Sequence, residues 1–349
     1  MKLESLTERE RSVLQAVVDS YIRTAEPTGS RRLVQHYELG VSPATVRNTM
    51  ADLEAKGLLT HPHTSAGRIP TDLAYRCYVD GLMDRTGPTI DDEQAIHREL
   101  LGGDPTSEIG TLVRRAARVL GLLTGELGLA VGPIIAEAVL VRLDLVRVDS
   151  EKALLVLTLE SGVVRTVYVD VPTAAPEASL NAVARVLNER LVGSTLREIH
   201  STLSERLRDV ALSDESATEL VNIFVESGPE IFEWAIEARD VHLGNVSVLA
   251  DQPEFTTSDR LRRLMELTER RDLLASVLGG RTVATGPQIT IGEENSAPEL
   301  SNLTVVTATF LVGHVEGVVG VIGPTRMPYE KVVALVDCTS SLVSRLVRN

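Results

Sequence analysis

The sequence predicts a multidomain α+β protein, and three observations point to that class. The chain has 349 residues, which is enough for two or three domains. Apolar residues recur at helical spacing through residues 7–57. Val- and Leu-rich runs bounded by turn residues, typical of strands, occupy 138–171 and return in 288–323 after a mostly helical stretch.

The first segment of the chain contains signals for two helices and a break between them. Thr7-Glu8-Arg9-Glu10 has the spacing of a capping box, and apolar residues continue at helical spacing to Ile22. Glu26-Pro27-Thr28-Gly29 interrupts this pattern. We expect Ser30 to cap a short second helix that runs from Arg31 to about Tyr37.

Residues 41–57 predict a third helix with one apolar face and one polar face. Ser42 is a good N-cap, Pro43 suits the first helical position, and Gly57 can end the helix in a left-handed conformation. Between them, apolar residues recur every third or fourth position. The opposite face is small, hydrogen-bonding and cationic, and it carries Ala44, Thr45, Arg47, Asn48 and Ala51.

Such a polar face suits the major groove of DNA. An arginine can bridge guanine O6 and N7, and an asparagine can bridge adenine N6 and N7. Ordinary solvated helix faces also carry these residue types, so the helix alone leaves both interpretations open.

Residues 58–70 predict a β-hairpin directly after the third helix. Leu58 and Leu59 begin one strand, residues 64–67 form the turn, and Arg68-Ile69-Pro70 returns. Thr71 is expected to cap a further helix. Two short helices joined by a turn form a helix-turn-helix, and the hairpin would be the wing of a winged helix. The wing offers His61, His63, Thr64, Ser65 and Arg68 to the DNA backbone or the minor groove.

These elements agree with one another and predict a DNA-binding domain. We expect the bases to be read by Arg47, Asn48, Thr45 and Thr49, and the backbone to be contacted by Ser42, Arg31, Arg32 and the wing. One winged helix contacts few base pairs, so a homodimer reading an inverted repeat is expected.

His61 and His63 share the spacing of a metal pair, but no third ligand is near them in sequence, and we expect no metal.

The charge distribution limits DNA contact to this N-terminal segment. The formal net charge of the chain is −14, yet residues 1–85 contain as many basic as acidic residues. The whole excess of negative charge therefore lies from residue 86 onward, and phosphate would repel that part of the chain.

The remaining chain predicts two groups of strands around a helical block. Residues 138–148, 152–161 and 163–171 predict strands, Ser179 is expected to cap the next helix, and His314–Gly317 is expected to be a hairpin turn. The helical block holds three of the few aromatic residues, which indicate either local core or a dimer contact: Phe224, Phe232 and Trp234.

These patterns suggest a domain organisation in four parts. We expect an N-terminal domain over 1–86, a linker over 87–105, an α+β domain formed by 106–195 and 279–349, and an inserted, mostly helical domain over 196–278.

The sequence offers no pattern for catalysis, membrane insertion or export. Glycine-rich and nucleophile motifs are absent in the required context, and Glu293-Glu294 is more typical of a solvated turn than of an acid–base pair. No apolar run is long enough for a membrane span, and the start has no apolar signal region. Cys77 and Cys338 form no disulfide or metal spacing, which fits a reducing cytoplasm. We expect neither enzyme activity nor a cofactor.

Several strings resemble the HrcA family of heat-inducible transcription repressors. EPTGSRRL, VSPATVRNTMADLEAKGLL and HPHTSAGRIPTDLAYRCYVD resemble its N-terminal signature. ADQPEF at 250–255, IGEEN at 291–295 and GVIGPTRMPYEKV at 320–332 resemble its later motifs in the same order, so the resemblance spans nearly the whole chain.

The resemblance implies a function and a set of partners. It implies a GAF-like fold for the split domain, a dimerising role for the insert, an inverted-repeat operator ahead of chaperone operons, inactivation on heat stress, and help from the GroE chaperonin. Two alternatives stay open. One is a small-molecule-responsive regulator that uses the GAF-like domain as a sensor, which requires a polar-lined pocket. The other is an interaction scaffold whose N-terminal domain binds protein.

Overall fold

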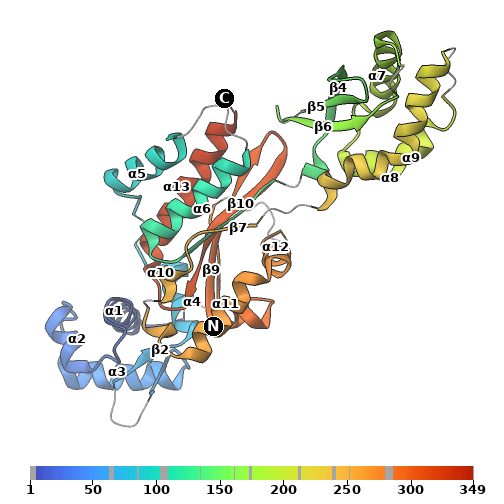
Figure 1. The fold of residues 1–349 in the computed structure, drawn as a ribbon. Coiled ribbons are helices and arrows are strands. Elements are labelled where there is room, and N and C mark those ends of the chain that lie inside the picture. The colour runs from blue at the N-terminus through green and yellow to red at the C-terminus, as the bar shows by residue number, and fades with distance from the viewer. Residues whose placement is uncertain are drawn as a thin grey trace. The chain divides into compact units, whose positions relative to one another are not determined.

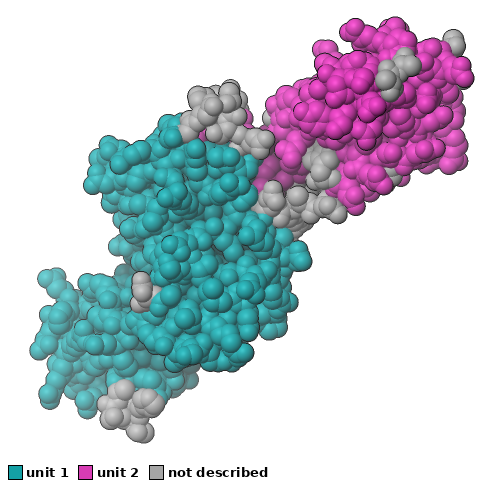
Figure 2. All heavy atoms as spheres, viewed as in Figure 1, with its two compact units in different colours: residues 1–131, 241–310, 318–345 teal, residues 132–240, 311–317, 346–349 magenta. Residues whose placement is uncertain are grey.

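The computed structural model divides the chain into two compact units (Figure 2). Unit 1 comprises residues 1–131, 241–310 and 318–345, and unit 2 comprises 132–240, 311–317 and 346–349. The residues that the structure describes are 5–62, 67–84, 86–102, 109–133, 135–160, 162–172, 175–210, 214–237, 241–250, 252–279 and 286–348.

Unit 1 begins with the expected winged helix-turn-helix (Figure 1). Its elements are α1 (Glu8–Thr24), α2 (Ser30–His36), α3 (Pro43–Ala55), β1 (Leu59–Thr60), β2 (Ile69–Pro70) and α4 (Asp72–Gly81). The capping box at Thr7 is present, and Gly57 adopts the left-handed conformation with φ of 74°. The prediction that Ser30 caps α2 is wrong by one position, because Gly29 is the N-cap and Ser30 is a buried residue of the first turn.

The body of unit 1 is a five-stranded sheet with helices on both faces. In order across the sheet, the strands are β7 (Val241–Leu243), β3 (Leu127–Val131), β10 (Val315–Pro324), β9 (Leu303–Val312) and β8 (Gln288–Ile291). The larger helices are α5 (Ile90–Leu101), α6 (Ile109–Thr124), α11 (Ser258–Glu269), α12 (Arg271–Gly279) and α13 (Tyr329–Arg348), and the short segments are α10 (Ser247–Ala250), η3 (Pro253–Phe255), η4 (Gly292–Glu294) and η5 (Pro298–Leu300).

Successive residues of β3 point to opposite faces of this sheet. Leu127 and Leu129 share one core with leucines of α11 and α12. Gly128 faces α6 at very close range, since a Cβ built on it would lie 1.8 Å from the Ala117 carbonyl oxygen. The two backbones therefore touch at Gly128, which leaves room for glycine alone.

Unit 2 is a three-stranded antiparallel sheet covered on one face by helices. Its main elements are β4 (Leu140–Arg147), β5 (Lys152–Leu159), β6 (Val164–Asp170), α7 (Glu177–Leu191), α8 (Leu196–Leu207) and α9 (Glu215–Glu237), with η2 (Ile135–Glu137) before them. Phe224 and Phe232 are buried in its core, which favours the local-core interpretation for both, and the side chain of Trp234 lies outside the described residues.

Two local expectations in this part of the chain are corrected. Pro176 occupies the N-cap of α7, and Ser179 lies inside the helix, where its hydroxyl donates to the Asp214 carboxylate. The turn between β9 and β10 is at Gly313-His314, and the strand resumes at Val315.

The division into units differs from the expected domain boundaries. Residues 132–195 belong with the helices that follow them, because the leucines of β4 and β5 are buried against α7, α8 and α9. Residues 241–278 belong with the sheet of unit 1, where β7 pairs with β3. The expected linker 87–105 contains α5, which packs on α6 and buries Ile96.

No helix in the described part of the chain is long and apolar enough to cross a membrane. The GAF-like character of the split domain stays an implication of the family resemblance.

A buried carboxyl group lies at the start of β3. Glu126 is 2 % exposed, and the side-chain amide of Gln252 donates to its Oε2 at 3.0 Å. Burial raises the pKa of Glu126 to about 8. The carboxyl is therefore mostly protonated at neutral pH in the folded protein and ionised in the unfolded chain.

We expect Glu126→Gln to stabilise the protein increasingly as the pH rises from 5 to 8. Between the unfolded pKa of 4.5 and the folded pKa of about 8, the folded state holds a proton that the unfolded state has lost. The free energy of unfolding then falls with rising pH. At pH 7 it is about 3 kcal/mol lower than at a pH where both states hold the proton. Glutamine removes this titration. Urea unfolding of both proteins at four pH values measures it, and a difference independent of pH would contradict the prediction.

Candidate nucleic-acid interface

The α3 helix presents the predicted polar face to solvent. The Ser42 hydroxyl accepts the Thr45 N–H at 3.2 Å and caps the helix, and Pro43 occupies its first position. Val46 and Leu53 are fully buried against the rest of the domain. Because this side is fixed in the core, the opposite side of α3 is held outward.

Arg47 and Asn48 lie exposed and adjacent on this outer side, as predicted for base-reading residues. Thr45 is half-buried, and its hydroxyl lies 3.0 Å from the Ser42 Oγ. The prediction that Thr49 reads bases is wrong. Thr49 is 5 % exposed, and its hydroxyl donates to the Thr45 carbonyl at 3.2 Å. It lies three residues after Val46 and therefore on the apolar stripe.

The two arginines at the start of α2 are placed at the surface of the winged helix. Arg31 is exposed. The Arg32 guanidinium forms an ion pair with Glu26 at 2.8 Å, and both side chains are largely exposed. Their contact with the DNA backbone stays a prediction.

The base of the wing is tied to α3 by a charged network. The Arg68 guanidinium lies 2.7 Å from Glu54 Oε2, and its Nη1 lies 3.1 Å from Nδ1 of His61. His61 Nε2 lies 3.6 Å from the same carboxylate. Arg68 and His61 therefore join the wing to α3, and their contact with DNA stays a prediction.

The tip of the predicted wing, with His63, Thr64 and Ser65, lies outside the described residues. Just after it, the backbone of Arg68 exchanges two hydrogen bonds of 3.0 Å with Thr28. Gly67 lies directly against this loop, because a Cβ on it would come within 2.4 Å of the Thr28 backbone. Within the described ranges, no three His, Cys, Asp or Glu side chains are grouped to hold a metal ion.

A charged pair joins α1 to the end of α3. Lys56 Nζ lies 2.6 Å from Glu10 Oε1, and the Glu10 side chain is only 10 % exposed. The hydrogen bond from Lys56 lowers the pKa of Glu10 below its ordinary value. This pair fixes the C-terminal end of α3 on the core of the domain.

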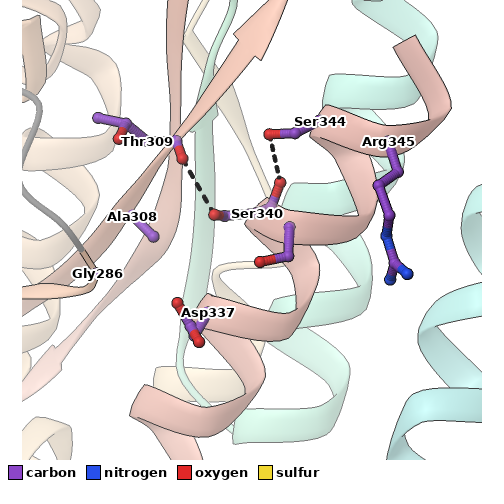
Figure 3. A pocket seen from close by; sticks show the side chains of 8 residues that line it. Gly286, Ala308, Thr309, Asp337, Ser340, Ser344 and Arg345 are labelled. Atoms are coloured by element: carbon purple, nitrogen blue, oxygen red, sulfur yellow. Dashed lines mark hydrogen bonds between the residues drawn. The ribbon is translucent and has the colours of Figure 1, made fainter. Parts of the chain in front are cut away.

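The sensor alternative requires a polar pocket, and unit 1 has a depression of about 420 Å³ between β9 and α13 (Figure 3). Asp337 and Arg345 on its rim are exposed. The Ser340 hydroxyl donates to the Thr309 carbonyl at 3.1 Å, and the Ser344 hydroxyl donates to the Ser340 carbonyl at 2.9 Å (Figure 3). These hydroxyls already have protein partners, so the depression does not favour a ligand-sensing function.

Two family models match the chain. The model described as "Winged helix-turn-helix transcription repressor, HrcA DNA-binding" matches residues 5–80. The model described as "HrcA protein C terminal domain" matches residues 110–333.

Individual proteins are similar along nearly the full length. The heat-inducible transcription repressor HrcA of Chlorobium phaeobacteroides (strain BS1) is 38 % identical over 356 residues, which cover 99 % of each chain. The same-named protein of Symbiobacterium thermophilum is also 38 % identical, over 98 % of this chain and 99 % of its own. A solved structure called "Crystal structure of a hypothetical protein at 2.2 A resolution" shares the fold, with a TM-score of 0.64, 22 % identity and 99 % coverage of both chains.

Proposed function

This chain belongs to the HrcA family of heat-inducible transcription repressors, and we propose that it represses chaperone operons by binding an inverted-repeat operator as a homodimer. The observation that carries the proposal is the exposed pair Arg47 and Asn48 on a helix whose other face is buried. An arginine and an asparagine can each bridge one base edge in the major groove. Ser42, Arg31 and Arg32 would contact the phosphates, together with the wing residues His61, His63, Thr64, Ser65 and Arg68.

The outer face of the unit 2 sheet supports the homodimer. Val146, Leu154 and Tyr168 pair across β4, β5 and β6 and lie on the face opposite the helices. Val146 is 52 % exposed and Tyr168 is 67 % exposed. These three side chains form an apolar cluster in the middle of a face that also carries the exposed ion pair of Arg142 and Asp144. A two-fold dimer would use this cluster from both subunits.

We assign the regulatory steps from the family membership. The repressor would be inactivated on heat stress and would act in the cytoplasm, where the GroE chaperonin would help it reach or keep its active fold. We assign it no catalytic step, since its named relatives are transcription repressors.

We expect Arg47→Ala and Asn48→Ala each to lose about 1–3 kcal/mol of operator binding, with relaxed sequence preference at the base each one reads. The measurement is titration of a labelled inverted-repeat duplex and a scrambled duplex at several salt concentrations, with and without chaperonin and ATP. Arg262→Ala is the matched control, because Arg262 is a 68 % exposed arginine on α11.

The outcomes of this titration separate the candidate functions. Selective binding with two subunits per duplex, improved by chaperonin, supports the repressor. Equal binding to both duplexes that vanishes with salt means that only phosphate is read. Unchanged binding by Arg47→Ala would contradict the assignment of α3 and favour the scaffold alternative.

A further inference from the structure

Arg76 links the winged helix to the body of unit 1. It lies on α4, and its Nε donates to Glu294 Oε1 at 2.8 Å while its Nη2 donates to the Ile289 carbonyl at 2.7 Å. Glu294 belongs to η4, and Ile289 belongs to the edge strand β8. The side chain of Arg76 is 25 % exposed, so these bonds are partly shielded from water.

Arg326 makes the reverse connection, from the body to the winged helix. It follows β10, and its guanidinium binds both carboxylate oxygens of Glu254, at 2.6 and 3.0 Å. Its Nη1 donates to the Ile22 carbonyl in the last turn of α1 at 2.8 Å. The Arg326 side chain is only 15 % exposed. A cation at the C-terminal end of a helix also meets the favourable end of the helix dipole.

Buried aromatic side chains also join the winged helix to the body. Tyr75 of α4 and Tyr329 of α13 are each at most 2 % exposed, with ring centroids 5.8 Å apart. The Tyr78 hydroxyl donates to Glu330 Oε1 at 3.0 Å. The winged helix is therefore docked on the body through charged, polar and apolar contacts together.

None of these contacts involves the outer face of α3. That helix packs on α1, α2 and β1, whereas the contacts with the body come from α4 and the end of α1. The direction in which α3 faces relative to the sheet is consequently set by side chains that do not belong to the predicted DNA-binding face.

We infer that Arg76 and Arg326 are positioning residues that give the repressor its selectivity for the spacing between the two halves of its operator. This inference rests on the proposed function. Two winged helices that are each fixed to their own body reach two half-sites over a narrower range of spacings than two that can turn freely on it. Winged helices released from their bodies still bind a half-site, but they lose the advantage of simultaneous binding.

The test uses the full-length protein and a duplex that the wild type selects from a random-sequence pool. Binding is measured to the selected inverted repeat, to one half-site alone, and to the same repeat with its spacer lengthened by about five base pairs, half a helical turn. The variant is Arg76→Gln with Arg326→Gln, and the control is Arg262→Gln on α11. Thermal unfolding establishes that each variant is folded.

We expect the wild type and the control to lose at least about tenfold in affinity when the spacer is lengthened, because only one half-site is then reached. The double variant should lose less than about threefold on lengthening, bind the selected repeat more weakly than the wild type, and bind the half-site within about twofold of it. A merely structural defect would weaken binding to the half-site as much as binding to the full inverted repeat.

Two results would overturn this inference and leave the proposed function standing. One is a wild type that binds the lengthened repeat as well as the selected one. The other is a folded variant that distinguishes the two spacers as strongly as the wild type. If the double variant does not fold, Arg326→Lys replaces it, since lysine keeps the charge but cannot bind Glu254 with the same paired geometry. A wild type that selects no inverted repeat would overturn the proposed function together with the inference.

Discussion

Tyr168→Asp will convert the proposed dimer to monomers and reduce affinity for the inverted repeat by about 10²–10⁴-fold, the advantage lost when two linked binding events become independent. Tyr168 is 67 % exposed on β6, so the substitution leaves the core of unit 2 intact. In the proposed dimer it would place two carboxylates in an apolar contact, where unpaired charges are costly.

Light scattering after size-exclusion chromatography measures the mass, and the duplex titration measures the affinity. Val146→Asp, on the same face two strands away, should have the same effect. Met265→Asp on α11 is the control, since Met265 is 48 % exposed and lies in unit 1. A Tyr168→Asp protein that keeps both the mass of a dimer and the affinity of the wild type would exclude this face as the interface.

Gly128→Ala will destabilise unit 1 by about 3 kcal/mol or more, at the upper end of what overpacking costs. The added methyl carbon would lie 1.8 Å from the Ala117 carbonyl oxygen and 2.7 Å from the Gly121 nitrogen. Both atoms belong to the backbone of α6, so no side-chain rotation can relieve the clash.

Gly110→Ala is the matched control, because Gly110 lies in α6, the helix that Gly128 contacts. A Cβ on Gly110 meets nothing within 4 Å, so alanine should be neutral or stabilising by up to about 1 kcal/mol. Thermal and urea unfolding of both variants provide the measurement. Equal stabilities for the two variants would mean that α6 can move away from β3 without cost.

The winged helix could be predicted from sequence because its signals are local. The residues that form a helix cap, a helix break or an apolar stripe lie within about four positions of the structure that they determine. Thr49 shows how the same information can be misread, since its place three residues after Val46 already indicated the buried side. The pairing of Arg68 with Glu54 could not be predicted from a local pattern, because the two side chains come together only in the folded domain.

The body and its connection to the winged helix depend on distant pairs. Arg76 and Glu294 are 218 residues apart, and Arg326 and Ile22 are 304 apart. Periodicity shows that a helix has an apolar face but not which sheet covers it. For that reason the expected grouping of residues 132–195 with 279–349 differs from the units of the structure. The pKa of Glu126 likewise depends on burial by segments far away in sequence.

The chain leaves the sheet of unit 1 at Val131 and returns at Val241, and these two residues are paired across β3 and β7. In topological terms, most of unit 2 is an enlarged hairpin connection. Such a connection can be shortened, lengthened or exchanged during evolution without breaking the strand order around it. The proposed dimer contact in unit 2 and the winged helix in unit 1 can therefore diverge separately within one polypeptide, as the products of two fused genes would.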